Sequence, residues 1–156
     1  RVVAMLAEGK RVCYVSDAGT PGVSDPGGKL VAAATRAGYG VVPIPGPSAM
    51  TAALSVAGFP TEPMTFVGFP PHKKGRKTFF AETAGRSDAV VLYESTHRIM
   101  KTLAELPQDR VAFVGRELTK LHETHYRGTV REIIAQLEQT STKGEFVIVL
   151  APTFWK

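Results

Sequence analysis

Hydrophobic positions along the chain form short continuous runs that alternate with segments of helical spacing. The runs at residues 11–16 (RVCYVS) and 40–44 (GVVPI) predict two strands, each followed by a helix. Before the first of these helices, Asp25 is expected as the N-cap and Pro26 as the first helical residue. Strands that alternate with helices in this way favour a parallel sheet covered by helices.

A break in both periodicities at residues 58–63 (GFPTEP) is the expected boundary between a first domain, residues 1–60, and a second domain, residues 61–156. Beyond it, strands are expected at 64–69 (MTFVGF), 89–95 (AVVLYES), 110–118 (RVAFVGREL) and 145–151 (EFVIVLA). Helices are expected over residues 76–84, after an N-cap at Ser95 or Thr96, and after a capping box at residues 129–132 (TVRE). The second domain is therefore expected to be an α/β domain with a mixed sheet.

The first ten residues (RVVAMLAEGK) have the pattern of the end of a helix that Gly9 caps, directly before the predicted strand at 11–16. In an α/β chain, a strand should precede such a helix. We therefore expect the native first domain to contain an N-terminal part that this sequence lacks.

Composition narrows the class of protein. The 156 residues are 44% hydrophobic, enough for a core, and the chain has no run of 18 apolar residues that would predict a membrane span. The one cysteine, Cys13, lies in a predicted strand and cannot form a disulfide within the chain, which favours a reducing, cytoplasmic setting. The net charge of +5 and the cations of residues 72–77 (HKKGRK) favour a polyanionic partner.

Two turns rich in glycine and proline follow the first two predicted strands. The longer one, from Ser16 (SDAGTPGVSDPGG), exceeds the roughly two to six residues that a plain connector needs. It matches neither the P-loop pattern nor the dinucleotide pattern G-x-G-x-x-G, and the second turn, residues 43–49 (PIPGPSA), repeats its architecture. Such turns at neighbouring strand ends indicate a small-molecule site. The alternative is that the longer segment is only an elaborate turn.

These turns belong to a series of motifs that runs through nearly the whole chain: VSDAGTPGVSDPG, PIPGPSA, LSVAGFP, GFPP, LYESTHR, RELTK and KGEFVIVL. In this order they closely resemble the ribosomal RNA small-subunit 2′-O-methyltransferase branch of the tetrapyrrole methylase superfamily. The resemblance implies two α/β domains with S-adenosylmethionine in the cleft between them, and a homodimer. It also implies methylation of the ribose 2′-hydroxyl of a cytidine in small-subunit (16S) ribosomal RNA, and a first domain that lacks the family's N-terminal glycine-rich strand and loop.

The resemblance further implies a set of cofactor-binding residues at the strand ends. They are Gly19, Thr20 and Val23 in the first turn, Ser48 and Ala49 in the second, and Leu92 and Tyr93 at the end of a second-domain strand. Many relatives have Gly-Asp-Pro where this chain has Gly19, Thr20 and Pro21. Contacts through the backbone would remain here, whereas a role of the aspartate side chain would not.

Two polar clusters follow strands of the second domain. They contain Glu94, Ser95, His97 and Arg98, and then Arg116, Glu117 and Lys120. Each cluster has two interpretations: helix capping and ion pairing, with Glu94 bound to Arg98, or a polar wall that orients the substrate. Because a ribose hydroxyl is a poor acid, a general base would help the reaction. Glu94 or Glu117 is expected in that catalytic role, with Lys120 stabilising the developing oxyanion.

The basic segment suits an RNA substrate or the 30S subunit. Lys73, Lys74, Arg76 and Lys77 are expected to pair with phosphates; the alternative is an ordinary solvated loop. The histidines of residues 122–125 (HETH) lack the H-E-x-x-H spacing, so a polar edge strand or loop is expected there and no metal site. Two other functions stay open: methylation of a porphyrin or corrin ring, and ribosome binding without catalysis.

Overall fold

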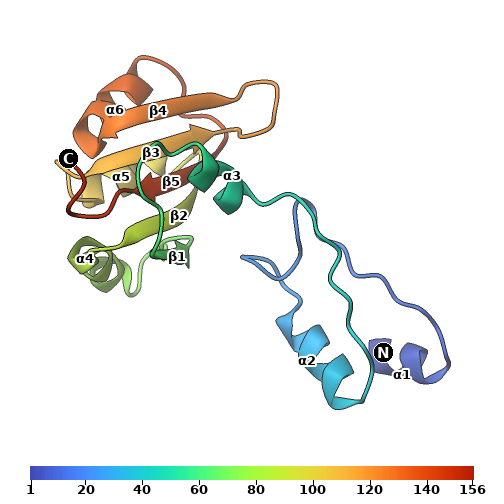
Figure 1. Cartoon of the computed structure of the whole chain (residues 1–156). Helices are drawn as coiled ribbons and strands as arrows, with labels where there is room; N and C mark the ends of the chain where they lie inside the picture. Colours follow the sequence, from blue (N-terminus) through green and yellow to red (C-terminus); the bar gives the residue numbers. More distant parts are fainter. The chain divides into compact units, whose positions relative to one another are not determined.

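The computed structural model describes residues 1–156, which form six helices and five strands in two compact units, Arg1–Ser48 and Ala49–Lys156 (Figure 1). The division falls directly before the helix that follows the second glycine-rich turn, earlier in the chain than the segment at 58–63. None of the six helices combines the length and the apolar composition that crossing a bilayer requires.

The first unit consists of two helices and long irregular segments. Helix α1 covers Val2–Ala7, helix α2 covers Gly28–Arg36, and the two helices contact each other. Ala34 on α2 is the only buried residue of this unit. The unit therefore has very little core of its own.

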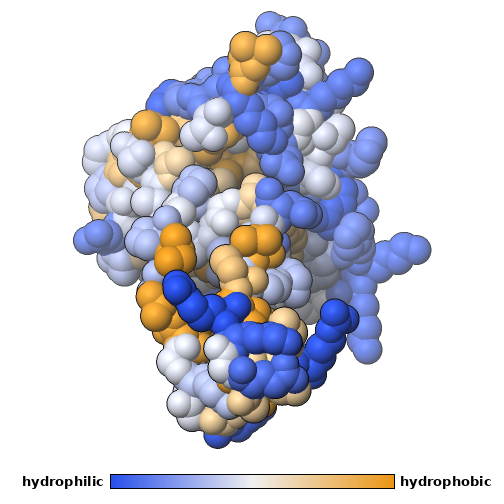
Figure 2. Space-filling model, turned by 90° about the vertical axis from the view of Figure 1, so that its right-hand side faces the viewer, coloured by the Kyte–Doolittle hydropathy of each residue, from blue (hydrophilic) through white to orange (hydrophobic).

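The strands expected at residues 11–16 and 40–44 are not formed. Neither segment pairs with another strand, and the side chains of Val15, Val42 and Ile44 are 75%, 79% and 73% exposed. A strand needs a neighbour that completes its backbone hydrogen bonds, and the first unit contains no strand that provides them. Apolar residues therefore reach the surface, and Figure 2 shows orange hydrophobic residues on the face that it views.

Helix α2 begins later than expected. Its N-cap is Gly27 rather than Asp25, with a φ of 147° that favours glycine. The Tyr14 hydroxyl donates a hydrogen bond of 2.7 Å to the Pro26 carbonyl, and a Cβ on Gly27 would lie 3.1 Å from the Tyr14 ring. Because Tyr14 holds Pro26 in the turn, the first helical residue is Gly28.

The second unit is built on a five-stranded mixed sheet in the order β1-β2-β5-β3-β4. Its strands are β1 (Met64–Gly68), β2 (Ala89–Ser95), β3 (Val111–Arg116), β4 (Thr124–Thr129) and β5 (Glu145–Leu150). β1 is parallel to β2, whereas β5 is antiparallel to β2 and β3, and β3 is antiparallel to β4. The four strands expected from apolar runs are confirmed, and the polar HETH segment leads into the edge strand β4.

The two faces of this sheet bury separate hydrophobic clusters. Its helices are α3 (Ala49–Ser55), α4 (Arg76–Gly85), α5 (Ile99–Glu105) and α6 (Val130–Glu138). Successive residues of β2 point to opposite faces, so Val90 and Leu92 pack with α4, α5 and α6. Val91 and Tyr93 pack with the short helix α3.

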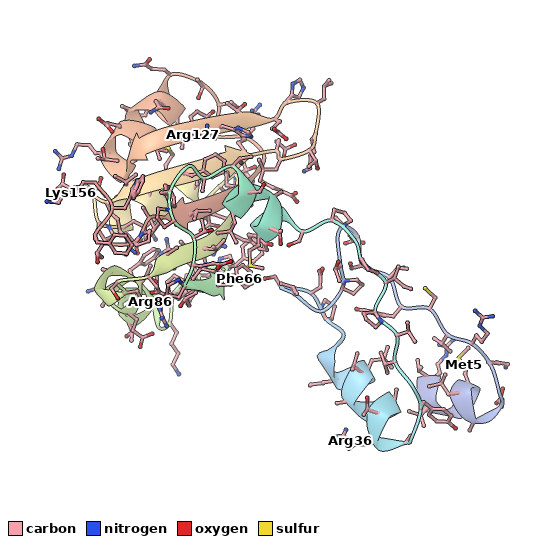
Figure 3. The ribbon with its side chains drawn as sticks, viewed as in Figure 1. Met5, Arg36, Phe66, Arg86, Arg127 and Lys156 are labelled. Atoms are coloured by element: carbon pink, nitrogen blue, oxygen red, sulfur yellow. The ribbon has the colours of Figure 1, made fainter.

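Arg127 connects the α3 region to the edge of the sheet. Figure 3 shows Phe66 on β1 and Arg127 on β4 at opposite edges of the sheet. The Arg127 guanidinium donates a hydrogen bond of 2.6 Å to the Val56 carbonyl, and it lies 4.8 Å from the centre of the Phe113 ring. The segment after α3 is thus bound to the strand at the far edge from β1.

Two expected helix caps have different outcomes. The capping box is confirmed: the Thr129 N–H donates to Glu132 Oε2 at 2.7 Å, and the Glu132 N–H donates to Thr129 Oγ1 at 3.3 Å. Helix α5, in contrast, has Arg98 as its N-cap instead of Ser95 or Thr96. The reason is that Ser95 is still part of β2, and the Thr96 hydroxyl is bonded to another strand end.

Candidate functional site

In the first unit, the two glycine-rich turns lie against each other. The Thr20 N–H donates a hydrogen bond of 3.2 Å to the Pro47 carbonyl. A Cβ on Gly19, which has a φ of 72°, would lie 2.9 Å from that carbonyl oxygen, and a Cβ on Gly46 would lie 3.2 Å from Thr20 Oγ1. Gly19 is therefore needed for the close approach, a side chain at Gly46 would crowd Thr20, and the structure brings together the two turns that the sequence paired.

The longer turn also borders an open hollow of about 470 Å³ within the first unit. The hollow is lined by Tyr14, Pro21, Gly22, Gly27, Val31 and Thr35, among others. None of the residues expected to bind a cofactor in this turn, Gly19, Thr20 and Val23, is part of that lining. Val23 is 47% exposed, and a Cβ on Gly22 would meet no atom within 4 Å, so the backbone of the turn is accessible to a ligand.

In the second unit, Tyr93 joins the start of α3 to the sheet. Its hydroxyl accepts a hydrogen bond of 3.1 Å from the Met50 N–H, one residue after Ala49. Phe66 and Phe69 contact the Tyr93 ring edge-on, with centroid distances of 5.0 and 5.6 Å. Tyr93 therefore belongs to an aromatic cluster at the carboxyl end of β2.

The other expected cofactor-binding residues differ in exposure. Leu92 is completely buried on the opposite face of the sheet, within the core formed by α4, α5 and α6, and neither its side chain nor its backbone is exposed. Ala49 is exposed and Ser48 is half-buried.

The carboxyl ends of β1, β2 and β3 lie at the same end of the sheet. β1 is parallel to β2, and β5 is antiparallel to both β2 and β3, so these three strands point in the same direction. The basic segment of residues 72–77, called the basic loop from here on, follows β1. The turn of residues 95–98 follows β2, and the segment 117–120 follows β3. β5 lies between β2 and β3, and its first residue, Glu145, pairs with Ser95.

The segment at the start of β5 is bound from both sides. Thr96 Oγ1 donates a hydrogen bond of 2.8 Å to the Gly144 carbonyl and accepts one of 2.7 Å from the Gly144 N–H. On the β3 side, Glu117 Oε1 accepts a hydrogen bond of 2.8 Å from the Glu145 N–H. A Cβ on Gly144 would lie 2.7 Å from Glu117 Cγ, which explains the glycine in the KGE motif. The two polar clusters therefore share one binding partner.

Glu94 is fully buried, and both of its carboxylate oxygens accept hydrogen bonds. Arg98 forms an ion pair with Oε1 at 2.7 Å, and the Ser95 N–H donates to the same oxygen at 2.8 Å. The Thr102 hydroxyl donates to Oε2 at 2.6 Å. These contacts agree with the interpretation that pairs Glu94 with Arg98, and they occupy the oxygens that a catalytic base would present to a substrate.

Glu117 and Lys120 form a second ion pair, which is more exposed. Lys120 Nζ lies 3.0 Å from Glu117 Oε1 and 2.9 Å from Glu145 Oε2. The hydrogen bond from the Glu145 N–H, followed by that from Lys120, holds the pKa of Glu117 below its ordinary 4.5. The hydrogen bonds to Glu145 and then to Glu117 raise the pKa of Lys120. Lys120 is therefore a cation at neutral pH, whereas the lowered pKa makes Glu117 a weaker base.

Replacing Glu117 with glutamine should change how stability depends on acid. The pKa of Glu117 is lower in the folded protein than in the unfolded chain, so its carboxylate contributes stability above pH 4.5 that is lost as the pH falls through the lowered pKa. We expect the melting temperatures of the wild type and of Glu117→Gln to differ at neutral pH and to converge as the pH falls below 4.5 and through the lowered pKa of Glu117. Circular dichroism melts across this range measure the effect. The control is Glu138→Gln, at an exposed position on α6, and curves for Glu117→Gln that stay parallel to the wild type would contradict the prediction.

The four cations of the basic segment have different surroundings. The exposed ones are Lys73, Lys74 and Lys77. Arg76 departs from the expectation, because only 6% of it is exposed. Its guanidinium lies 3.0 Å from a Glu105 oxygen and 4.8 Å from the centre of the Phe80 ring, and both groups compensate the buried charge. The three lysines remain predicted phosphate contacts, and Arg76 is bound internally.

In the HETH segment, the side chains of His125 and Glu123 lie against each other. His125 Nε2 lies 3.0 Å from Glu123 Oε1, and the His125 ring contacts the Phe113 ring edge-on at a centroid distance of 5.3 Å. Nowhere in residues 1–156 do three or more His, Cys, Asp or Glu side chains gather in a way that could hold a metal ion.

Sequence reasoning missed Thr102, a buried polar residue that connects the charged groups of this region. Thr102 donates its hydroxyl hydrogen to Glu94 and accepts a hydrogen bond of 3.0 Å from Arg76 Nη2. The available signal was its position four residues after Arg98, because residues with this spacing share one face of a helix. Apolar Ile99, three residues before Thr102, lies on the same helix face and is buried, so this threonine could be expected to be buried.

The sequence matches the profile of a known family and a group of named relatives. Residues 1–134 match the family described as Tetrapyrrole (Corrin/Porphyrin) Methylases. The chain is 40% identical over 153 residues to the Ribosomal RNA small subunit methyltransferase I of Thermotoga maritima, covering 96% of this chain and 69% of the relative. Identity to the protein of the same name is 43% in Synechocystis sp., with 96% and 56% covered, and 46% in Borrelia garinii, with 94% and 68% covered. Across such curated relatives the chain spans 53% to 69% of their length.

Solved structures share the fold. The methyltransferase CobJ superposes with a TM-score of 0.68 at 24% identity, covering 97% of this chain and 68% of that chain. A uroporphyrin-III-C-methyltransferase from Thermus thermophilus superposes with a TM-score of 0.65 at 22% identity, covering 96% and 68%. At these identities the likeness concerns the fold alone.

Proposed function

This chain belongs to the tetrapyrrole (corrin/porphyrin) methylase family, in the branch of the ribosomal RNA small subunit methyltransferases I, and we propose on this basis that its protein methylates the ribose 2′-hydroxyl of a cytidine in 16S ribosomal RNA, with S-adenosylmethionine as the methyl donor. The structural observation that carries the proposal is that three functional segments lie at the same end of the sheet. The exposed lysines of the basic loop and the two polar clusters all follow strands that end there. A long polyanion could contact all three segments at once.

The chain offers residue types that suit S-adenosylmethionine, which has an aromatic base, ribose hydroxyls and a charged amino-acid end. The first turn has an accessible backbone at Gly22, and the second unit has the aromatic cluster around Tyr93. The residues proposed to hold the cofactor are Gly19, Thr20, Val23, Ser48, Ala49, Leu92 and Tyr93. When bound, S-adenosylmethionine supplies an electrophilic methyl group on a sulfonium centre.

For this reaction the protein has to orient the ribose and to accept the proton of its 2′-hydroxyl. Phosphate contacts from the basic loop would position the RNA, so that the ribose hydroxyl is aligned with the methyl group before the reaction. Of the two carboxylates expected as the base, Glu117 is the more accessible, because both oxygens of buried Glu94 are occupied. We propose that Glu117 accepts the hydroxyl proton and that the Lys120 ammonium stabilises the negative charge on the ribose oxygen.

Methyl transfer from radiolabelled S-adenosylmethionine to 30S subunits tests the proposal directly. The intact protein is incubated with subunits that lack the modification, and the RNA is digested to nucleosides. Label in 2′-O-methylcytidine is the expected result. Label on a base, or no label in the RNA, would contradict the proposed function.

Removing lysines from the basic loop should weaken RNA binding and its dependence on salt. Each phosphate contact that is lost reduces the slope of log affinity against log salt by about one, so Lys73→Ala combined with Lys74→Ala should reduce it by about two. The slope is measured by titrating 30S subunits at a series of salt concentrations. Lys101→Ala serves as the control, because it also removes a lysine charge, from an exposed position on α5. An unchanged slope for the double variant would show that this loop does not contact phosphate.

Two alternatives remain for the same fold. Methylation of a porphyrin or corrin stays open because the family model that the chain matches is described by these two substrates. Label transferred to a carboxylated tetrapyrrole and not to RNA would support it. A ribosome-binding protein without catalysis would bind 30S subunits and transfer no label. We also propose that the protein is cytoplasmic and forms a homodimer. Sedimentation of the intact protein measures its oligomeric state.

A further inference from the structure

A closed circuit of hydrogen bonds and ion pairs lies at the base of the basic loop. Arg98 Nη1 donates to the Pro70 carbonyl at 2.9 Å, and Arg76 Nη1 donates to the carbonyl of the next residue, Pro71, also at 2.9 Å. The two arginines are connected through Glu94 and Thr102: Arg98 pairs with Glu94 Oε1, Thr102 donates to Glu94 Oε2, and Arg76 donates to Thr102. The circuit therefore begins and ends at adjacent carbonyls of one short segment.

The groups of this circuit are hidden from solvent. The Glu94 side chain is 0% exposed, that of Arg76 is 7% exposed and that of Arg98 is 16% exposed. Glu105 adds a second carboxylate, so the two arginines face two acids. Every buried polar side-chain atom has a hydrogen-bond partner. Such a saturated network has one preferred geometry, because any displacement leaves a charge unpaired.

The segment held by the circuit leads directly into the exposed lysines. Pro70 is buried and Pro71 is half-buried, whereas Lys73 and Lys74 are exposed. Both prolines have a fixed φ and lack an N–H, so their carbonyls are the groups through which this backbone can be held. The Arg76 N–H also donates to the Lys73 carbonyl at 3.2 Å, which closes the loop on its other side.

We propose that this circuit, with Arg98 as its most accessible arginine, is a device that positions the basic loop for contact with RNA phosphates. The inference rests on the proposed function for the identity of the polyanion. It assigns the Glu94–Arg98 part of the YESTHR motif to substrate positioning through the loop, rather than to direct contact with the reacting atoms. Arg98 is thus a positioning residue, and Lys73 and Lys74 are the groups that contact the RNA.

A double-mutant cycle on the intact protein tests this assignment. Arg98→Ala should weaken binding of 30S subunits about tenfold, while the affinity for S-adenosylmethionine and kcat at saturating RNA change less than about twofold. In the background of Lys73→Ala and Lys74→Ala, the same change should weaken binding less than about twofold further, because the loop no longer carries its contacts. Arg98→Lys, which keeps the charge and one donor, should fall between the wild type and the alanine variant.

Other results of the cycle would overturn the assignment. If Arg98 contacted RNA directly, its effect would be equally large with and without the two lysines. If Arg98 only supported the fold, Arg98→Ala would lower the melting temperature and leave RNA affinity per folded molecule unchanged. Lys101→Ala, on the same helix, controls for the loss of one positive charge.

Trypsin provides a readout that does not depend on RNA. Because trypsin cleaves after lysine, a released loop should be cut after Lys73 or Lys74 about tenfold faster in Arg98→Ala than in the wild type. Thr102→Val breaks the middle of the circuit without changing charge, and it should accelerate the same cleavage even if Arg98→Ala does not fold. Equal cleavage in Thr102→Val and the wild type would overturn the positioning role. If the variants are cleaved faster but the wild type does not bind 30S subunits, the proposed function is overturned and the positioning role is not.

Discussion

We expect Gly19→Ala to weaken the binding of S-adenosylmethionine at least tenfold, because the two turns of the first unit could no longer touch. The added Cβ would lie 2.9 Å from the Pro47 carbonyl oxygen, closer than a methyl group and an oxygen approach. The Cβ is fixed rigidly to the backbone and the Pro47 oxygen is part of it, so the clash can be relieved only by moving one turn away from the other. The hydrogen bond from the Thr20 N–H to Pro47 would be lost with that movement.

Gly38→Ala is a matched control for this prediction. Gly38 has a φ of 82°, close to the 72° of Gly19, but a Cβ at Gly38 would meet no atom within 4 Å. Both variants therefore carry the backbone strain of about 1–2 kcal/mol that a left-handed residue with a side chain costs, and only Gly19→Ala adds the clash. Calorimetric titration of the intact variants measures the affinities. Equal affinities for the two variants would show that contact between the turns does not shape the cofactor site.

The second large effect is expected for Glu94→Ala, which should lower the free energy of unfolding by about 3–5 kcal/mol. The substitution leaves the mostly buried Arg98 without its ion-pair partner. It also removes the acceptor of the Thr102 hydroxyl and of the Ser95 N–H. Urea denaturation measures the loss, with Glu82→Ala on an exposed position of α4 as the control, for which we expect a change within about 0.5 kcal/mol.

Glu94→Gln separates a structural role of this carboxylate from a catalytic one. The amide keeps the size of the side chain but cannot form an ion pair with Arg98, so we expect an intermediate loss of stability and a kcat close to that of the wild type. A general base contributes about 10²- to 10⁴-fold to a rate. A stable Glu94→Gln protein whose kcat falls by that factor would contradict the structural assignment and restore Glu94 as the base.

The contrast between the two units shows which features a pattern can predict. The strands at 89–95 and 145–151 were predicted because their apolar residues serve both faces of a covered sheet, and the structure buries them there. The run at 11–16 has the same apolar character, yet it is not a strand in this structure. Apolar character indicates that a segment can pair, but pairing depends on a neighbour that the pattern of the segment does not describe.

The charged residues show the same limit. Arg76 and Lys77 are adjacent cations in a basic segment, and nothing local distinguishes them. Arg76 is buried because Glu105, 29 residues away along the chain, approaches its guanidinium. Likewise, the sequence alone left Glu94 between capping and catalysis, and the choice between them depends on Thr102 and Arg98 together.

By itself, the sequence determined four of the five strands of the second unit, the capping box at Thr129 and the family, because each of these depends on residue types in a fixed order along the chain. Only the tertiary structure decided which cations face solvent, that the two polar clusters share the start of β5, and that Pro70 and Pro71 are held by one circuit. The physical reason is that a buried charge is tolerated only where partners from distant segments converge, and that convergence is a property of the packed sheet and helices.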